Sequence, residues 1–137
     1  AFIWPMRLLS LVAWAVSSVR DRRILPLLFD VSAMRCRSGG AVPQDLSSIA
    51  WAVATSRTRD PSVQQLMANV SEESQRKIGE FVPQDIAMCA WAFAKVVCRD
   101  ARLLNLFADE STRRVTELNG QNLANVVWSM ATIREFH

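Results

Sequence analysis

The sequence predicts an all-α protein, built as an α-solenoid of about three and a half stacked helical hairpins of 37–40 residues. Four tryptophans support this prediction, because they recur at intervals of 37, 40 and 37 residues: Trp14, Trp51, Trp91 and Trp128. Each lies in a similar segment: LLSLVAWAVSS, DLSSIAWAVAT, DIAMCAWAFAK and NLANVVWSMAT. Self-similarity at such a period is typical of proteins whose units stack on one another. The chain also lacks the alternating pattern and the hairpin turns of β-strands.

We therefore expect one helical-repeat domain over residues 1–137, with units near 5–40, 41–80 and 81–118 and a partial unit at 119–137. The first half of each unit is predicted to form an inner helix, over residues 6–19, 44–57, 84–98 and 121–134. Pro43 and Pro83 suit a first helical position, and Asp45 and Asp85 suit the positive end of a helix. These helices are apolar nearly all round, which predicts neighbours on several sides and enclosed tryptophan rings. Trp91→Ala is then expected to cost about 3–5 kcal/mol.

The second half of each unit is predicted to form an outer, amphipathic helix, over residues 22–36, 61–79 and 101–118. Narrow apolar stripes support this prediction: Ile24, Leu27 and Leu28; Val63, Leu66, Met67 and Val70; and Leu103, Leu106 and Phe107. Asp60 before Pro61 is a candidate helix cap. The acidic pairs Glu72–Glu73 and Asp109–Glu110 are expected on solvated faces.

The composition fits a small helical domain rather than a membrane protein. The chain has 137 residues, 50% of them hydrophobic, and a net charge of +3. Its longest apolar run, Ile86–Ala94, is far shorter than the roughly 18–20 residues that cross a bilayer, so we expect no direct membrane insertion. Leu8–Val16 could imitate a signal sequence, but it aligns with the inner helices. Because the chain begins with Ala, we expect a processed precursor or a fragment.

Residues for catalysis or metal binding are scarce in this sequence. The single histidine is His137, which leaves no Ser–His or Cys–His pair within the repeats. Cys36, Cys89 and Cys98 lack the spacing of metal ligands and are expected to be free thiols in a reducing compartment. Only four glycines are present, and no glycine-rich phosphate loop is found. We therefore expect a protein that is not an enzyme and that uses no cofactor or metal.

Basic residues gather in the turn that follows each inner helix. We call them the basic ridge: Arg20, Arg22, Arg23, Arg57, Arg59, Lys95 and Arg99. Stacking of the units would align these turns, and positive charge at successive units can follow a phosphate backbone. Basic residues near the carboxyl ends of helices also complement the helix dipole, and that explanation remains open.

The repeated segment Pro-Gln-Asp-Leu-x-x-x-Ala-Trp-Ala-x-Ala resembles the octotricopeptide repeat family of helical hairpins. The match runs through Pro43–Ala54, Pro83–Ala94 and Gly120–Ala131, and more loosely through Met6–Ser17. It is similar to repeats of apicomplexan and dinoflagellate organelle proteins and, more distantly, to FAST-kinase-like proteins with a RAP domain. The resemblance implies binding of single-stranded or ribosomal RNA in a mitochondrion or plastid, for RNA processing, stability, translation or ribosome assembly. By position it assigns RNA contacts to Gln44, Ser47, Ser48, Gln84, Met88, Gln121, Asn122 and Asn125.

The alternative function is that of a structural subunit, recruited as a scaffold in an organellar ribosome or a bioenergetic membrane complex and bound mainly to its protein subunits. The first inner helix is apolar from Leu8 to Val16, and no outer helix follows Leu123–Ile133 in the sequence. We therefore expect apolar surface at both ends, covered by further repeats, by a partner subunit or by another copy. An open basic ridge would favour RNA binding, whereas an exposed apolar patch would favour the scaffold.

Overall fold

The computed structural model describes residues 25–56, 61–96 and 100–135, and these form six α-helices and no strand. The prediction of an all-α fold is confirmed for this part of the chain. The helices, in chain order, are α2 (Leu25–Arg37), α3 (Pro43–Ser56), α4 (Ser62–Arg76), α5 (Pro83–Lys95), α6 (Ala101–Arg113) and α7 (Gly120–Glu135). Two short 3₁₀ helices, η1 (Ile78–Glu80) and η2 (Val115–Glu117), follow α4 and α6. The predicted helix at 6–19 lies outside the described residues.

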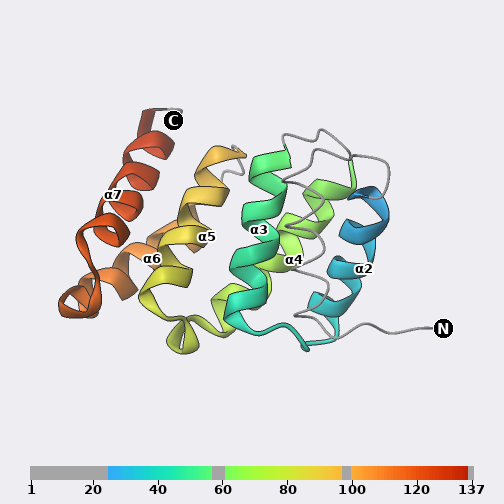
Figure 1. Cartoon of the computed structure of the whole chain (residues 1–137), viewed down its shortest axis with the longest axis horizontal. Coiled ribbons are helices and arrows are strands. Elements are labelled where there is room, and N and C mark those ends of the chain that lie inside the picture. The colour runs from blue at the N-terminus through green and yellow to red at the C-terminus, as the bar shows by residue number, and fades with distance from the viewer. Residues whose placement is uncertain (1–24, 57–60, 97–99, 136–137) are drawn as a thin grey trace.

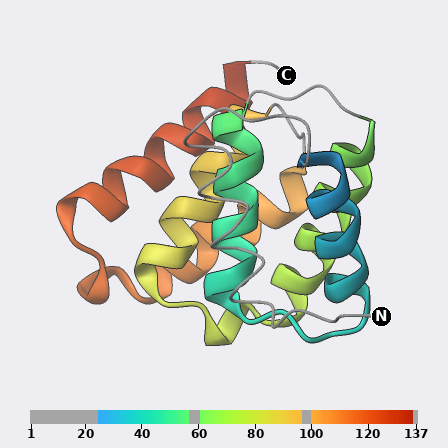
Figure 2. The ribbon, with the colours of Figure 1, turned by 45° about the vertical axis from the view of Figure 1, so that its right-hand side comes forward.

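The helices are arranged in two layers (Figures 1 and 2). The inner helices α3, α5 and α7 lie side by side, with α5 in the middle and in contact with both neighbours. The outer helices α4 and α6 lie behind them, and α2 packs against α4. Each outer helix also contacts the inner helix that precedes it in the chain, so that α3–α4 and α5–α6 are helical hairpins. The described part of the chain is therefore repeat-like as well as helical.

Local signals in the sequence explain where α5 and α6 begin. Pro83 is the first residue of α5, where its missing N–H needs no intrahelical partner. Asp100 caps α6, because its Oδ1 accepts a hydrogen bond of 3.0 Å from the backbone N–H of Leu103. Asp60, the candidate cap of α4, lies outside the described residues.

The outer helices end earlier than predicted. We expected them to reach residues 79 and 118, but α4 ends at Arg76 and α6 at Arg113. Lys77 and Arg114 leave the helical conformation, with φ/ψ of −110°/17° and −113°/30°. The chain then tightens into η1 and η2, because it must turn back towards the inner layer within a few residues. The inner helix α5 likewise stops at Lys95 rather than at residue 98.

One continuous core lies between the two layers. Its largest fully buried side chains include Leu46 and Ile49 of α3, Phe93 of α5, and Leu103 and Phe107 of α6. Inner helices place alanines between these larger residues, which allows helix backbones to approach closely. Leu27, a residue of the predicted apolar stripes, is not part of this core.

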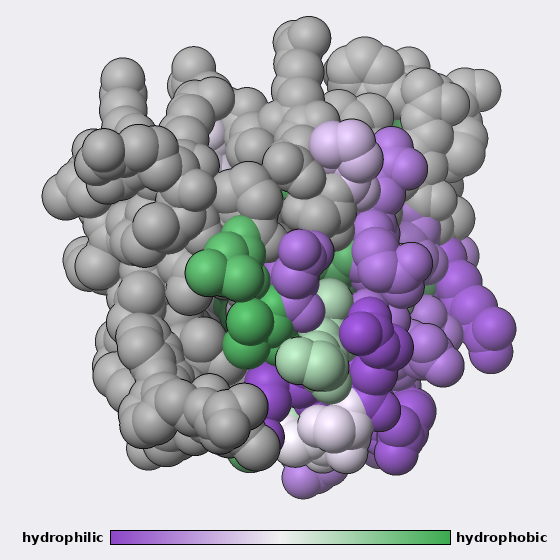
Figure 3. Space-filling model, turned by 90° about the vertical axis from the view of Figure 1, so that its right-hand side faces the viewer, coloured by the Kyte–Doolittle hydropathy of each residue, from purple (hydrophilic) through white to green (hydrophobic). Residues whose placement is uncertain are grey.

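Leu27 of α2 is 66% exposed, although the stripe pattern predicted it to be buried. Met34, two turns further along the same helix, is exposed as well. Figure 3 shows this end of the molecule, where an apolar patch lies beside polar surface. The prediction of a buried position is therefore wrong for Leu27, whereas Ile24 and the side chain of Leu28 lie outside the described part of the structure, and α2 contributes Ala33 and Cys36 to the core.

A buried glutamate near the end of each of the outer helices α4 and α6 forms ion pairs, in contrast to the solvated acidic pairs that we expected. Glu73 of α4 is only 4% exposed and contacts Arg76 (2.6 Å) and Lys77 (3.3 Å). Lys77 reaches back to the connection between α2 and α3, where its Nζ donates to the backbone carbonyls of Gly39 (3.0 Å) and Ala41. Lys77 thus ties the end of one hairpin to the start of the same unit's inner helix.

The next unit repeats the same arrangement. Glu110 of α6 is 7% exposed and contacts Arg113 (2.5 Å) and Arg114 (3.6 Å). Arg114 donates to the backbone carbonyl of Phe81, in the connection that leads into α5. The predictions for Glu73 and Glu110 were wrong because a carboxylate can be buried when a neighbouring cation and hydrogen bonds compensate it. The other member of each pair, Glu72 and Asp109, is exposed as predicted.

Candidate nucleic-acid interface

Each inner helix carries the same three positions on one face, which we call the amide–indole face. A glutamine at position i is followed by a polar or flexible residue at i+4 and by tryptophan at i+7, a spacing that places all three on one side of a helix. The three rows are Gln44, Ser48 and Trp51 on α3; Gln84, Met88 and Trp91 on α5; and Gln121, Asn125 and Trp128 on α7.

The tryptophans are less enclosed than we predicted. Trp51 and Trp91 are half-buried, and Trp128 is 43% exposed, so the expectation of enclosed rings is wrong for Trp128. Trp14 lies outside the described residues. The core is filled instead by Leu46, Ile49 and their counterparts on the opposite side of the inner helices. Because Trp91 retains solvent contact, its replacement by alanine should cost less than the 3–5 kcal/mol range of a fully buried aromatic residue.

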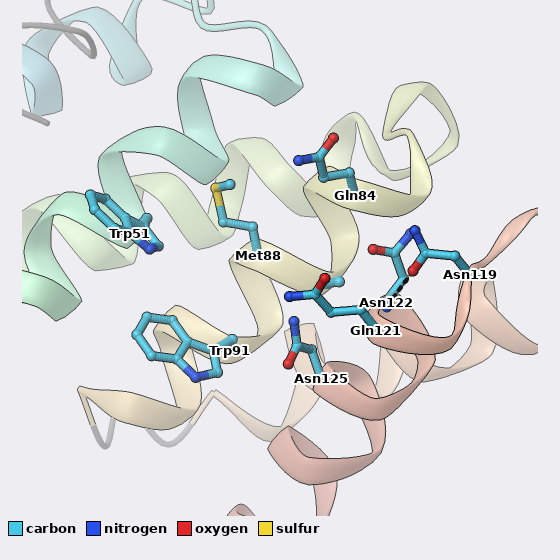
Figure 4. A pocket seen from close by; sticks show the side chains of 9 residues that line it. Trp51, Gln84, Met88, Trp91, Asn119, Gln121, Asn122 and Asn125 are labelled. Atoms are coloured by element: carbon cyan, nitrogen blue, oxygen red, sulfur yellow. Dashed lines mark hydrogen bonds between the residues drawn. The ribbon is translucent and has the colours of Figure 1, made fainter.

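A groove of about 510 Å³ opens on the amide–indole face between the three inner helices (Figure 4). Trp51 comes from α3, and Met88 and Trp91 come from α5, where Met88 lies between the two indoles. Amide side chains form the other wall. The full lining is Trp51, Gln84, Ala87, Met88, Trp91, Asn119, Gln121, Asn122 and Asn125. We call this site the amide–indole groove.

The groove combines flat apolar rings with neutral hydrogen-bonding groups. None of the described residues that line it carries a charge. Each glutamine or asparagine amide offers two N–H donors and one oxygen acceptor, so the wall can match either kind of partner. The start of α7 orients one of these amides, because Oδ1 of Asn119 accepts a hydrogen bond of 2.8 Å from the backbone N–H of Asn122. Such a groove suits an uncharged, planar ligand with polar edges.

The structure brings together five of the eight residues of the inner helices that the resemblance assigned to RNA binding. Gln84, Met88, Gln121, Asn122 and Asn125 all line the amide–indole groove. Gln44 and Ser48 do not line it, although they share a helix face with Trp51 one unit earlier.

Ser47 has a structural role instead of contacting the groove. It is buried, and its hydroxyl donates to the carbonyl of Gln44 (3.0 Å) and to Oδ1 of Asp85 (3.2 Å). The bond to Asp85 joins the first turns of α3 and α5. Partial burial raises the pKa of the Asp85 carboxyl, while the hydrogen bonds from Ser47 and from the backbone of Val82 oppose that rise.

The basic ridge is described at one position only. Lys95 is exposed at the end of α5, one turn beyond Trp91 and on the same side of the helix. Arg20, Arg22, Arg23, Arg57, Arg59 and Arg99 lie outside the described residues. Lys95 therefore places one positive charge next to the amide–indole groove, and the ridge as a whole stays a prediction.

The tryptophans and Asn119 were not predicted as site residues. Trp51 and Trp91 were expected in the core because they lie in alanine-rich, apolar helices. The signal that could have identified them is their register with the polar positions, since Gln84 and Trp91 are seven residues apart and share a face.

The cysteines behave as small core residues. Cys36 and Cys89 are fully buried, and burial is the main cause that raises the pKa of the Cys36 thiol to about 12. Burial also raises the pKa of the Cys89 thiol. Cys98 lies outside the described residues. We expect iodoacetamide to leave Cys36 and Cys89 unmodified in the folded protein at pH 8 and to modify both in urea, as peptide mass spectrometry would detect. Modification of either thiol before unfolding would contradict this assignment.

Two further properties concern the described residues only. Over residues 25–56, 61–96 and 100–135, no group of three histidine, cysteine or acidic side chains is arranged to hold a metal ion. Within the same ranges, no helix has the length and apolar character needed to cross a membrane. Comparison of the chain with models of protein families, with curated proteins and with solved structures finds no match.

Proposed function

We propose that this protein is an RNA-binding helical-repeat module and that single-stranded RNA lies along its amide–indole face. The observation that carries the proposal is the amide–indole groove, where Trp51 and Trp91 stand opposite a wall of amide side chains. In this proposal α3–α4 and α5–α6 are successive turns of an α-solenoid, with α7 as the inner helix of the next turn. The side-by-side packing of α3, α5 and α7 supports that arrangement.

The indoles would supply affinity by stacking. Every nucleobase has a planar aromatic face, and stacking on an aromatic side chain contributes about 1–3 kcal/mol per base. Trp51 and Trp91 are half-buried, so the rings are held in place by the core while part of each remains accessible. Unpaired bases are needed for such stacking, which favours single strands over duplex RNA.

The amides would contribute to the choice of base. Gln84, Gln121 and Asn125 present both donors and acceptors, and a side-chain amide can form two hydrogen bonds with the edge of adenine. The absence of charge among the described lining residues fits contact with bases rather than with phosphates. The phosphates of the RNA backbone would lie along the edge of the amide–indole groove, where Lys95 is one helical turn from Trp91. The resemblance to octotricopeptide-type repeats favours an RNA of a mitochondrion or plastid.

Titration of single-stranded RNA against groove variants tests this function. We expect the wild-type chain to bind labelled RNA of about 12 nucleotides, and Trp91→Ala to weaken that binding by about tenfold through the loss of one stacking platform. Trp91→Phe should recover most of the affinity because it keeps an aromatic face. The triple variant Gln84→Ala, Gln121→Ala and Asn125→Ala should reduce the difference between the affinities for poly(A) and poly(U). Fluorescence anisotropy measures all of these affinities.

Met34→Ala is the matched control, because Met34 is an exposed apolar residue on α2 and lies outside the groove. Its affinity for RNA should equal that of the wild type, and circular dichroism should show every variant to be folded. Failure of the wild-type chain to bind single-stranded RNA even at low salt would refute the function. Equal affinities of Trp91→Ala and Met34→Ala would remove the groove from RNA binding, and saturable binding of an extended peptide alone would assign the groove to protein.

A further inference from the structure

A second groove, of about 650 Å³, lies at the other face of α7, between α6 and α7. We call it the end groove. Apolar side chains dominate its lining: Leu104, Ala108, Val115, Leu123, Val126, Val127, Met130, Ala131 and Ile133, with Asn105, Ser111 and Thr112 at its edge. Val127 is 58% exposed, and Val115 and Leu123 are exposed as well. The described residues therefore leave an apolar surface open beside α6.

The equivalent groove one unit earlier is filled by a helix of this chain. The groove between α4 and α5 receives α6, which contacts both helices and η1. Leu103, Leu104 and Phe107 of α6 are fully buried, and Leu104 also borders the end groove. The Phe107 ring packs against Phe81 with their centroids 5.6 Å apart. The end groove is the next position in this series, so it is continuous with an interface that already exists within the chain.

The two helices that occupy the outer layer at successive units share one pattern. In α4 and the residue that follows it, the pattern is Leu66, Met67, Val70, Glu73 and Lys77. In α6 and the residue that follows it, the pattern is Leu103, Leu104, Phe107, Glu110 and Arg114. Both series therefore run i, i+1, i+4, i+7 and i+11. The first three residues are buried, the glutamate pairs with the final basic residue, and that residue donates to a backbone carbonyl in front of an inner helix.

The carbonyls that accept these bonds are equivalent in the repeat. Ala41 and Phe81 each lie two residues before the first residue of an inner helix, and Leu118 holds that place before α7. A third outer helix would therefore place its basic residue at Leu118 and its apolar residues in the end groove.

From this equivalence we propose that the end groove docks an amphipathic helix of the same type as the outer helices α4 and α6. The helix carries apolar residues at i, i+1 and i+4, glutamate at i+7 and lysine or arginine at i+11. Among the described residues of this chain, the two helices with the pattern, α4 and α6, are buried within their own fold, so neither is free to enter the end groove of a second copy. This interaction surface is separate from the amide–indole groove, so it does not rest on RNA binding.

A peptide with the sequence of residues 100–114 tests the proposal, since it is the helix that fills the equivalent groove. The peptide is cross-linked on its polar face, because isolated helices of this length are marginal in water. We expect it to bind the full chain of residues 1–137 with a saturable anisotropy curve. Val127→Glu in the chain should weaken this binding by about tenfold or more, because it places a charge in an apolar contact. Arg114→Gln in the peptide should weaken it about fivefold through the loss of one charge-assisted bond.

Val82→Glu is the matched control in the chain, because Val82 is also an exposed valine but lies outside the end groove. It should leave the affinity unchanged, and a scrambled peptide should not bind. No saturable binding by the wild-type chain, or equal binding by Val127→Glu and Val82→Glu, would overturn the proposal. Self-association in sedimentation that Val127→Glu abolishes would assign the end groove to a second copy and would also overturn it. Each of these results is independent of the RNA titration.

Discussion

Phe107→Ala is expected to lower the free energy of unfolding by about 3–5 kcal/mol, the range for large aromatic truncations in a core. Phe107 is fully buried on α6 and contacts the ring of Phe81. It lies where α6 meets α4, α5 and η1, so the cavity would open between two hairpins rather than at a surface. Domains of this size are stable by roughly 5–15 kcal/mol, which makes this loss a large part of the total. Urea denaturation followed by circular dichroism measures it.

Trp128→Ala provides the comparison, because Trp128 is a larger aromatic residue but is 43% exposed. Its replacement leaves no enclosed cavity and should cost clearly less than Phe107→Ala. Should the two variants unfold at the same urea concentration, the assignment of the core to the layer between inner and outer helices would be wrong.

Lys77→Met is expected to destabilise the protein by about 3 kcal/mol, because it removes the less exposed of the two cations that compensate the buried Glu73 carboxylate. Glu73, at 4% exposed, would keep only Arg76 as a partner. The carbonyls of Gly39 and Ala41 would also lose their bonds to the ammonium group. Thermal or urea denaturation gives the size of the effect.

A double-mutant cycle separates the ion pair from simple loss of a surface charge. Lys77→Met combined with Glu73→Met should recover most of the loss, since the two apolar side chains leave no buried charge and the Arg76 side chain is 65% exposed to solvent. Arg76→Met is the matched control, because the Arg76 side chain is 65% exposed and its pair with Glu73 should contribute less than about 1 kcal/mol. If Lys77→Met costs no more stability than Arg76→Met, the contacts of Lys77 with Glu73 and with the carbonyls before α3 do not stabilise the fold.

Much of the fold follows from local patterns in the sequence. The recurrence of tryptophan gives the period, and Pro43, Pro83 and Asp100 mark the starts of helices. These features act through backbone geometry and nearby hydrogen bonds, so a short stretch of sequence suffices to predict them. The resemblance to octotricopeptide-type repeats, carried over by position on the inner helices, also pointed to the polar residues of the candidate site except Asn119.

The sequence by itself determined the helical class, the repeat period and the polar residues of the amide–indole groove other than Asn119. Only the tertiary structure decided which of the remaining side chains are buried. Glu73 and Glu110 are buried because Lys77 and Arg114 reach back across a hairpin to cover them. Trp91 stays partly accessible because the neighbouring inner helices pack against the other sides of α5. Burial depends on which helix lies beside a given face, and that is a property of contacts between residues distant in the chain, which a local pattern does not contain.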